Sequence, residues 1–210
     1  MLPETLPIFP LPNVVLFPQV FLPLHIFEPR YRAMVGEALE GDRIIGMTLL
    51  KPGWEDDYEG RPPVYPIGCA GLITHAERLA DGRFNIVLRG LEKFRLLGED
   101  PSKPYRLARV EPLDEPSCRE IATMRTERRK LEHMILAAGR ADATREDLSS
   151  ITPPSMPDED FVNALAQYLN FDPLEKQALL EVPDALARCR SVIDLLEMKN
   201  LVGSRGWVSE

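Results

Sequence analysis

Histidines offer acid–base chemistry near neutral pH, because the unperturbed imidazole pKa is about 6.5. The sequence contains three of them, His25, His75 and His133, and they lie far apart. A catalytic base must act on a group held within hydrogen-bond reach, and this spacing supplies no such partner. We therefore expect all three to be structural or surface side chains.

Thiols and carboxylates are the other groups that could carry chemistry, as metal ligands or redox pairs. The three cysteines, Cys69, Cys118 and Cys189, form no Cys-x-x-Cys pair. The acidic run from Trp54 to Glu59 lacks the residue spacing and the glycine of a calcium loop. The sequence therefore predicts reduced core thiols, a solvated acidic loop, and neither a metal nor another cofactor.

The signatures of the common enzyme classes are also missing. ATP hydrolysis by a phosphate-binding loop needs a Gly-Lys pair, and the sequence has no such dipeptide. It has no Gly-x-Ser-x-Gly, His-Glu-x-x-His or Gly-x-Gly-x-x-Gly motif either. We expect a protein that is not an enzyme. For an enzyme of a kind that these motifs do not detect, His25, Glu28 and Arg89 are the first catalytic candidates.

Composition and charge narrow the choice of partners. The 210 residues are 44% hydrophobic and 28% charged, as in ordinary globular domains, and their formal net charge is -8. This balance makes nucleic acid an unfavourable partner, because phosphates attract positive surfaces. No apolar stretch is long enough to span a bilayer, and no basic and apolar leader opens the chain. We expect a cytoplasmic protein with no membrane partner.

The elements that must hold these side chains change in kind along the chain. From Leu6 to Glu111, short apolar runs broken by proline and glycine predict the strands of a curled, mostly antiparallel sheet. One helix, from Pro29 to Glu40, interrupts them. The pair Asp81-Gly82 predicts a hairpin turn, because both residues tolerate a positive φ, and Gly90 predicts a bulge or corner.

From Pro116 onward the hydrophobic period becomes that of helices. Helix starts are marked by capping residues, namely Ser117 with Glu120, Asp158, and Asp172 with Glu175. A last helix is expected from about Asp184 to Leu201. The sequence thus predicts an α+β protein with a strand-rich domain over residues 1–116 and a helical bundle over residues 117–210.

The run from Leu6 to Pro18 is punctuated by prolines, and the run from Pro23 to Val35 contains a Phe-Glu-x-Arg-Tyr helix entry. Both runs resemble the first strands and the helix entry of the N-terminal substrate-binding domain of Lon-type proteases. The segment from Ile67 to Leu97 resembles its central hairpin, and Asp172 to Cys189 resembles its helical end. The resemblance covers most of the chain, from Leu6 to about Leu196.

The resemblance implies a PUA-like pseudo-barrel joined to a helical subdomain. It also implies a non-catalytic module that binds unfolded or tagged polypeptides in protein quality control, by itself or as an adaptor to a separate ATP-dependent protease. The ATPase and serine-lysine protease modules of the full protease have no counterpart in the sequence, so a stand-alone member of the family is expected. Two alternatives stay open: an RNA-binding PUA-like protein, and an enzyme with a pocket between barrel and helices.

A binding site for unfolded chains should be apolar, because denatured polypeptides share exposed hydrophobic side chains. The candidates are Leu16, Phe17 and Phe21, which lie in a segment whose prolines limit regular strand pairing. Tyr31 and Met34 on the neighbouring helix would extend the patch, with methionine as an adaptable contact. We expect these side chains to be available at the surface.

Overall fold

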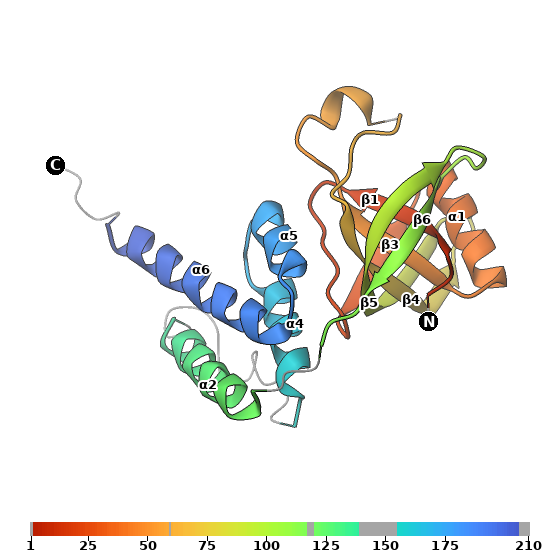
Figure 1. The fold of residues 1–210 in the computed structure, drawn as a ribbon. Helices are drawn as coiled ribbons and strands as arrows, with labels where there is room; N and C mark the ends of the chain where they lie inside the picture. The colour runs from red at the N-terminus through yellow and green to blue at the C-terminus, as the bar shows by residue number, and fades with distance from the viewer. Residues whose placement is uncertain (1, 59, 117–119, 139–154, 206–210) are drawn as a thin grey trace.

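The computed structural model describes residues 2–58, 60–116, 120–138 and 155–205. The strands come first and enclose a barrel, and the later helices lie beside it in an α+β architecture, as the sequence predicts (Figure 1). The elements are β1 (Thr5–Leu11), β2 (Phe21–Ile26), α1 (Pro29–Glu40), β3 (Ile44–Leu49), η1 (Glu55–Asp57), β4 (Ile67–Arg78), β5 (Phe84–Asp100), β6 (Arg106–Leu113), α2 (Ile121–Ala138), α4 (Asp158–Tyr168), α5 (Pro173–Glu181) and α6 (Ala185–Arg205).

Five of the described strands form a closed ring. Its order is β1, β3, β4, β5 and β6, and β6 then returns to β1. Among the described strands, only the pairing of β1 with β3 is parallel, which confirms the prediction of a mostly antiparallel sheet. The long β5 strand makes closure possible, because its first half pairs with β2 and its second half pairs with β6. Within this ring, β3 is almost entirely buried.

Helix α1 has the bounds that the sequence predicts, Pro29 to Glu40. Proline suits the first turn because its φ is already helical and its missing N–H would have no partner there. The apolar face of the helix is buried against the barrel, through Tyr31, Met34, Val35 and Ala38. The helix therefore belongs to the barrel and contributes to its core.

The hairpin predicted at Asp81-Gly82 joins β4 to β5. Of the two residues, only Gly82 has a positive φ, 82°. Asp81 stabilises the loop by accepting a hydrogen bond from the Arg83 backbone N–H at 3.1 Å. The loop is closed by the Leu79 N–H donating to the Arg83 carbonyl at 2.8 Å. It is therefore longer than the two-residue turn that needs a positive φ at both positions.

Gly90 lies at an irregularity between β4 and β5, as the sequence predicts. A side chain there would collide with the backbone of Phe17 and Pro18. The Gly90 N–H donates to the Val20 carbonyl and the Gly90 carbonyl accepts from the Gln19 N–H, both at 2.9 Å. The glycine thus lets the segment before β2 cross the barrel wall in close contact.

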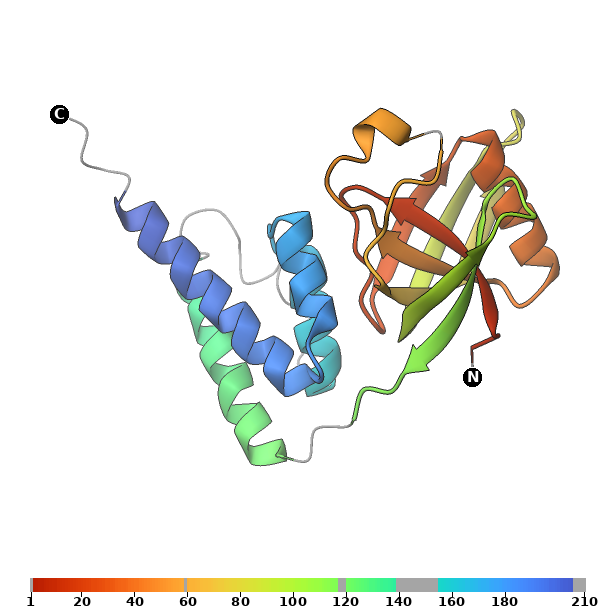
Figure 2. The same cartoon turned by 45° about the horizontal axis from the view of Figure 1, so that its top comes forward.

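The later part of the chain is helical, as the sequence predicts, but not every helix has the predicted capping residue. Asp172 and Glu175 form the predicted capping box of α5. Asp158 does not cap α4 but lies inside its first turn, after Pro157, and its carboxylate accepts from Arg128 of α2 at 2.7 Å. The last helix runs to Arg205, beyond the expected end. The cap predicted at Ser117 falls outside the described residues. Figure 2 shows α2 and α6 lying side by side.

One hydrophobic cluster joins the barrel to the helices. It contains barrel residues such as Phe17 and Leu88 together with helical residues such as Leu165 and Val192. A second, smaller cluster is made of barrel residues, including Leu6 and Phe94. The strands end at Leu113 and the described helices resume at Ile121, on either side of the expected boundary. The division into two domains at residue 116 stays a prediction.

Candidate functional site

The structure buries four of the five side chains that the sequence offers as a polypeptide contact. Phe17 and Met34 are fully buried, Leu16 is 1% exposed and Tyr31 is 3% exposed. The expectation that they are available at the surface is therefore wrong. Only Phe21, at 51%, is exposed.

Phe17 is buried because it lies between the barrel and the helices. Its backbone N–H donates to the Gln167 side-chain oxygen of α4 at 3.3 Å, and its ring lies 5.7 Å from the guanidinium carbon of Arg188 in α6. Prolines on this segment interrupt strand pairing without exposing the side chains. Tyr31 packs its ring 4.3 Å from that of Phe9, in the apolar face of α1. Both side chains are packing residues.

Phe21 begins β2, which has a strand partner on one side only among the described strands. On the other side, the Tyr168 hydroxyl of α4 donates to the Phe21 carbonyl at 2.9 Å. Tyr168 is itself half-exposed. Pro23, two residues along the same edge, has no N–H to offer. Phe21 therefore stays a candidate contact, at an edge with few free backbone donors.

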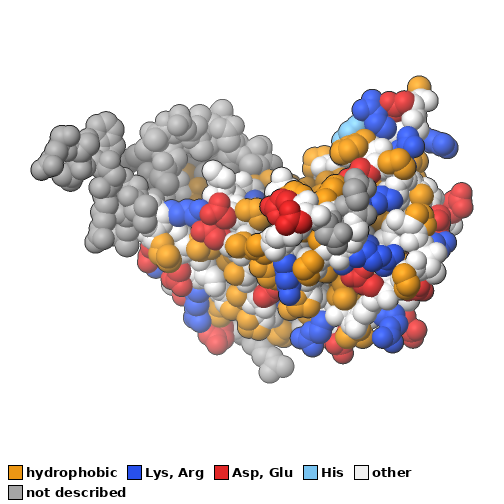
Figure 3. All heavy atoms as spheres, turned by 90° about the horizontal axis from the view of Figure 1, so that it is seen from above, with side chains coloured by type: hydrophobic (Ala, Val, Ile, Leu, Met, Phe, Trp, Pro, Cys, Tyr) orange, Lys and Arg blue, Asp and Glu red, His pale blue; other side chains and the backbone are white. Residues whose placement is uncertain are grey.

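An open apolar depression lies between α5 and α6, and we call it the α5–α6 groove. Its volume is about 520 Å³. Five of its eight lining residues are apolar: Leu174, Ala178, Leu179, Val182 and Leu195, with Glu175, Ser191 and Asp194 completing it. Leu174 is 50% exposed, so the groove presents hydrophobic surface to solvent. On the face shown in Figure 3, hydrophobic side chains gather over the middle of the molecule.

Charges border this groove without filling it. Burial alone would raise the pKa of Glu175, but the Lys199 ammonium at 2.9 Å and the Asp172 backbone N–H hold that pKa below its usual value. Asp194 is exposed on α6. Since the floor is apolar and one rim carboxylate is already paired, the groove suits hydrophobic side chains better than charged ones.

A second cleft, of about 490 Å³, lies where the barrel meets the helices. It is lined by several carboxylates, including Glu92, Asp114 and Asp160. The catalytic candidates His25, Glu28 and Arg89 do not line it. His25 shares a hydrogen bond with Asn85 at 2.8 Å, and Glu28 accepts from Arg30 and Tyr58. A cleft exists where the enzyme alternative requires one, but it does not gather the residues proposed for catalysis.

Beneath this cleft, a buried ionic cluster connects the two parts. Arg188 is fully buried and donates to Glu115, to the Asn163 side chain at 2.6 Å and to the Leu179 carbonyl at 2.9 Å. Lys93 of β5 lies 3.4 Å from the same Glu115 and donates to the Val182 carbonyl at 2.7 Å. Burial lowers the pKa of Lys93. Lys93 joins the barrel to the end of α5, and Arg188 links Glu115 to α4 and α5, so the cluster is structural.

Neither described thiol is placed for chemistry. Cys69 and Cys189 are free and buried, as the sequence predicts, and Cys118 lies outside the described residues. Burial raises the pKa of Cys69 above its usual range and that of Cys189 to about 12.

Among the described residues, no group of three or more His, Cys, Asp or Glu side chains could hold a metal ion. In the same part of the chain, no helix combines the length and apolarity needed to cross a membrane.

Comparison with known families identifies the chain. Residues 5–198 match the model of the ATP-dependent protease La (LON) substrate-binding domain. The chain belongs to this family. The resemblance seen in the sequence is thereby confirmed, and with it the expectation that the fold is that of a Lon N-terminal domain.

Two curated relatives of this LON-domain chain are named Lon proteases. It is 29% identical over 203 residues to Lon protease 2 of Myxococcus xanthus and 32% identical over 200 residues to the Lon protease of Trichlorobacter lovleyi. These matches cover 94% and 93% of the chain but 24% of each relative. The chain therefore spans about a quarter of the length of these proteases. Their names refer to the full-length proteins.

Solved structures support the LON fold. A Lon N-terminal domain protein from Xanthomonas campestris superimposes with a TM-score of 0.60, at 22% identity, over 90% of this chain and 97% of that one. The N-terminal domain of a Mycobacterium avium complex Lon protease gives 0.65 at 17% identity, over 92% and 98%. At these identities the likeness concerns the fold alone.

Sequence reasoning missed the α5–α6 groove, although α5 carries a usable signal. Its residues Leu174, Leu179 and Leu180 do not share one face of a helix, because they span more than half of its circumference. Leu179 and Leu180 are buried and Leu174 is exposed. A short helix with more leucines than one face can bury must leave some of them at the surface.

Proposed function

We propose that this LON-domain protein binds polypeptides through their apolar segments, and that the α5–α6 groove is the main contact. The observation that carries the proposal is an open apolar groove, with Leu174 half-exposed, in a chain of the substrate-binding family. An apolar floor recognises what unfolded chains have in common, which is hydrophobic side chains that a folded protein would bury.

The expected affinity is modest. Burying one leucine-sized side chain contributes about 1.5–3 kcal/mol. The groove has room for a few such side chains, and the lost freedom of a flexible ligand offsets much of their contribution. We therefore expect weak binding, with dissociation constants on the order of 0.1–1 mM and little dependence on salt.

The test compares two leucines of similar exposure. Leu174→Glu places a charge in the groove, whereas Leu97→Glu places one on β5 of the barrel, where Leu97 is 55% exposed. Binding to a reduced, carboxymethylated and permanently unfolded protein is measured by fluorescence anisotropy. Leu174→Glu should weaken binding about tenfold, because it removes roughly one buried leucine, and Leu97→Glu should not. Equal affinities of the two variants would refute the groove as the site.

We further infer that the bound polypeptides are clients of protein quality control, which an ATP-dependent protease degrades. The support is the family, whose relatives are named Lon proteases. Pull-downs from native cytoplasm, with and without heat stress, test this inference. Heat stress should increase the amount of client and of ATPase-bearing protease recovered, and Leu174→Glu should abolish the increase. If the amounts of client and protease recovered change neither with heat nor with the substitution, the inference is contradicted.

A further inference from the structure

A small pocket of about 180 Å³ lies on the barrel, lined mainly by arginine and tyrosine: Arg30, Tyr31, Arg61, Tyr105 and Arg106. Its walls come from the start of α1, the segment before β4 and the turn between β5 and β6. None of the described lining residues is acidic, in a chain whose net charge is -8. The pocket is thus a positive site on a negative protein.

Arg106 forms the fixed wall of this pocket. It is 7% exposed, and its guanidinium donates to both carboxylate oxygens of Glu99, through Nε at 2.8 Å and through Nη2. Its Nη1 donates to the Pro62 carbonyl at 2.7 Å. A guanidinium held by a carboxylate fork and a carbonyl is pre-oriented, so ordering it again for a ligand would cost little.

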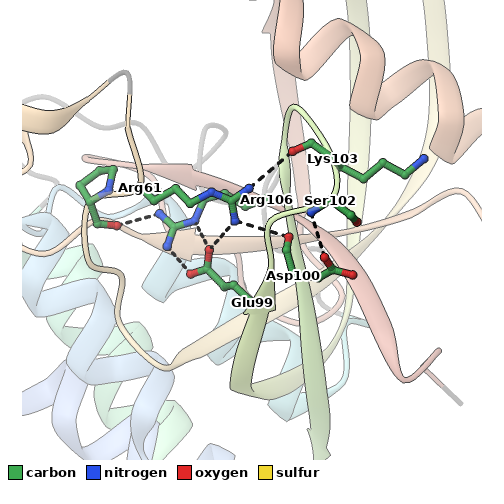
Figure 4. A network of polar contacts seen from close by, with 7 residues as sticks. Arg61, Glu99, Asp100, Ser102, Lys103 and Arg106 are labelled. Atoms are coloured by element: carbon green, nitrogen blue, oxygen red, sulfur yellow. Dashed lines mark hydrogen bonds and ion pairs between the residues drawn. The ribbon is translucent and has the colours of Figure 1, made fainter.

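Arg61 is held much more loosely. Its Nη1 lies 3.6 Å from Glu99, too far for a hydrogen bond, and its two contacts with the Asp100 and Lys103 carbonyls are long, at 3.4 and 3.5 Å. Its side chain is 36% exposed. Figure 4 shows both guanidinium groups reaching the single carboxylate of Glu99. Two positive charges therefore share one partly buried carboxylate, and Arg61 keeps donors that a better acceptor could take.

The neighbouring charges do not compete strongly for Arg61. The Asp100 carboxylate is exposed to solvent and accepts from the Ser102 backbone N–H at 2.8 Å, so water screens its attraction to Arg61. The Lys103 ammonium is paired with Glu37 at 2.7 Å. The excess positive charge at the mouth of the pocket therefore belongs to Arg61.

We propose that this pocket binds a small oxyanion, a carboxylate or a phosphate, carried by a bound polypeptide. The planar guanidinium fork of Arg61 matches two oxygens of either group. At about 30 Å³ for each water, the volume corresponds to roughly six water molecules, which leaves room for one such group and too little for a nucleotide. The polypeptide carrier rests on the proposed function, whereas binding of the free anion does not.

The first experiment uses inorganic phosphate and acetate, titrated into the protein at constant ionic strength and followed by NMR shifts of the pocket residues. Arg61→Gln should weaken binding about tenfold or more, because it removes a charge-assisted pair of hydrogen bonds. The matched control is Arg95→Gln, since Arg95 is exposed, loosely paired at 3.7 Å and outside the pocket. Saturable binding that is lost in Arg61→Gln alone supports the site. Absence of binding, or equal affinity of both variants, overturns it.

The second experiment identifies the source of the oxyanion. One peptide is compared in four forms: with phosphoserine or serine, and with a free or amidated C-terminus. Preference for phosphoserine assigns a phosphorylated side chain, and preference for the free carboxylate assigns a chain terminus. If phosphate binds but all four forms bind equally, the polypeptide-borne oxyanion is overturned. Leu174→Glu should leave these preferences unchanged, so failure of the groove and failure of the pocket are distinguishable.

Discussion

The barrel and the helical part treat their hydrophobic side chains differently. Among the described residues, the barrel exposes three large hydrophobic side chains over more than a hundred residues, and the helical part exposes five over fewer: Ile121, Leu136, Tyr168, Leu174 and Met198. Closing a sheet into a ring gives each strand two neighbours and one inner face. Helices bury only a stripe, so paired helices leave grooves between them. The barrel is the better scaffold, and the helices provide the better apolar contact surface.

The largest expected effect tests whether the two parts are one unit. Arg188→Met would leave Glu115 and Asn163 without their buried partner and should lower the free energy of unfolding by about 3–5 kcal/mol. Urea denaturation measures the change. The control is Arg190→Met, because Arg190 is exposed and pairs with Glu127 at 3.3 Å, a contact worth less than about 1 kcal/mol. Similar stabilities of the two variants would show that the cluster does not couple barrel to helices.

A somewhat smaller change in the free energy of unfolding distinguishes a packing residue, Phe17, from a possible contact residue, Phe21. Phe17→Ala empties a fully buried site and should cost about 3 kcal/mol or more, whereas Phe21→Ala should cost less than about 1 kcal/mol. Thermal or urea unfolding measures both. If Phe21 touches polypeptides, its truncation should also weaken capture of unfolded protein. A stable Phe17→Ala variant with weakened capture would restore Phe17 as a contact residue.

The smallest effect concerns pH on the barrel side. Hydrogen bonds from Lys103 and Tyr105 hold the pKa of Glu37 below its usual 4.5. Because the folded pKa is the lower one, the stabilisation is complete above the unfolded value and is lost as pH falls through the folded value. Wild type should therefore melt at a higher temperature than Glu37→Gln at pH 7, by a small margin that shrinks as the pH falls below 4.5 and on through the lowered pKa. A margin independent of pH would exclude this carboxylate as its source.

Local patterns in the sequence predicted the elements well. The bounds of α1, the β4–β5 hairpin, the Gly90 irregularity and the α5 capping box depend on neighbours in the chain, and the structure has them all. The cap assigned to Asp158 was wrong because a long-range partner, Arg128, takes its carboxylate. Caps are decided locally only when no tertiary partner competes.

The binding residues were harder to predict because exposure is a tertiary property. Tyr31 and Met34 lie in the apolar stripe of α1, a pattern that indicates burial, and the structure buries them. Phe17 is buried by α4 and α6, which lie about 150 residues or more along the chain. The α5–α6 groove is formed by the relative placement of two helices. The small pocket that Arg61 lines is formed by three segments that are distant in the sequence. No local pattern contains that information.

The edge of β2 that faces away from β5 pairs with no other described strand, and this has a consequence for aggregation. An exposed strand edge is a template on which other chains can assemble, and aggregation begins at such edges. Here Pro23 removes one donor from the middle of the edge, and the Tyr168 hydroxyl occupies the Phe21 carbonyl. Two ladder positions are thus blocked, which disfavours the addition of other chains, or of further copies of this chain, along this edge of the sheet.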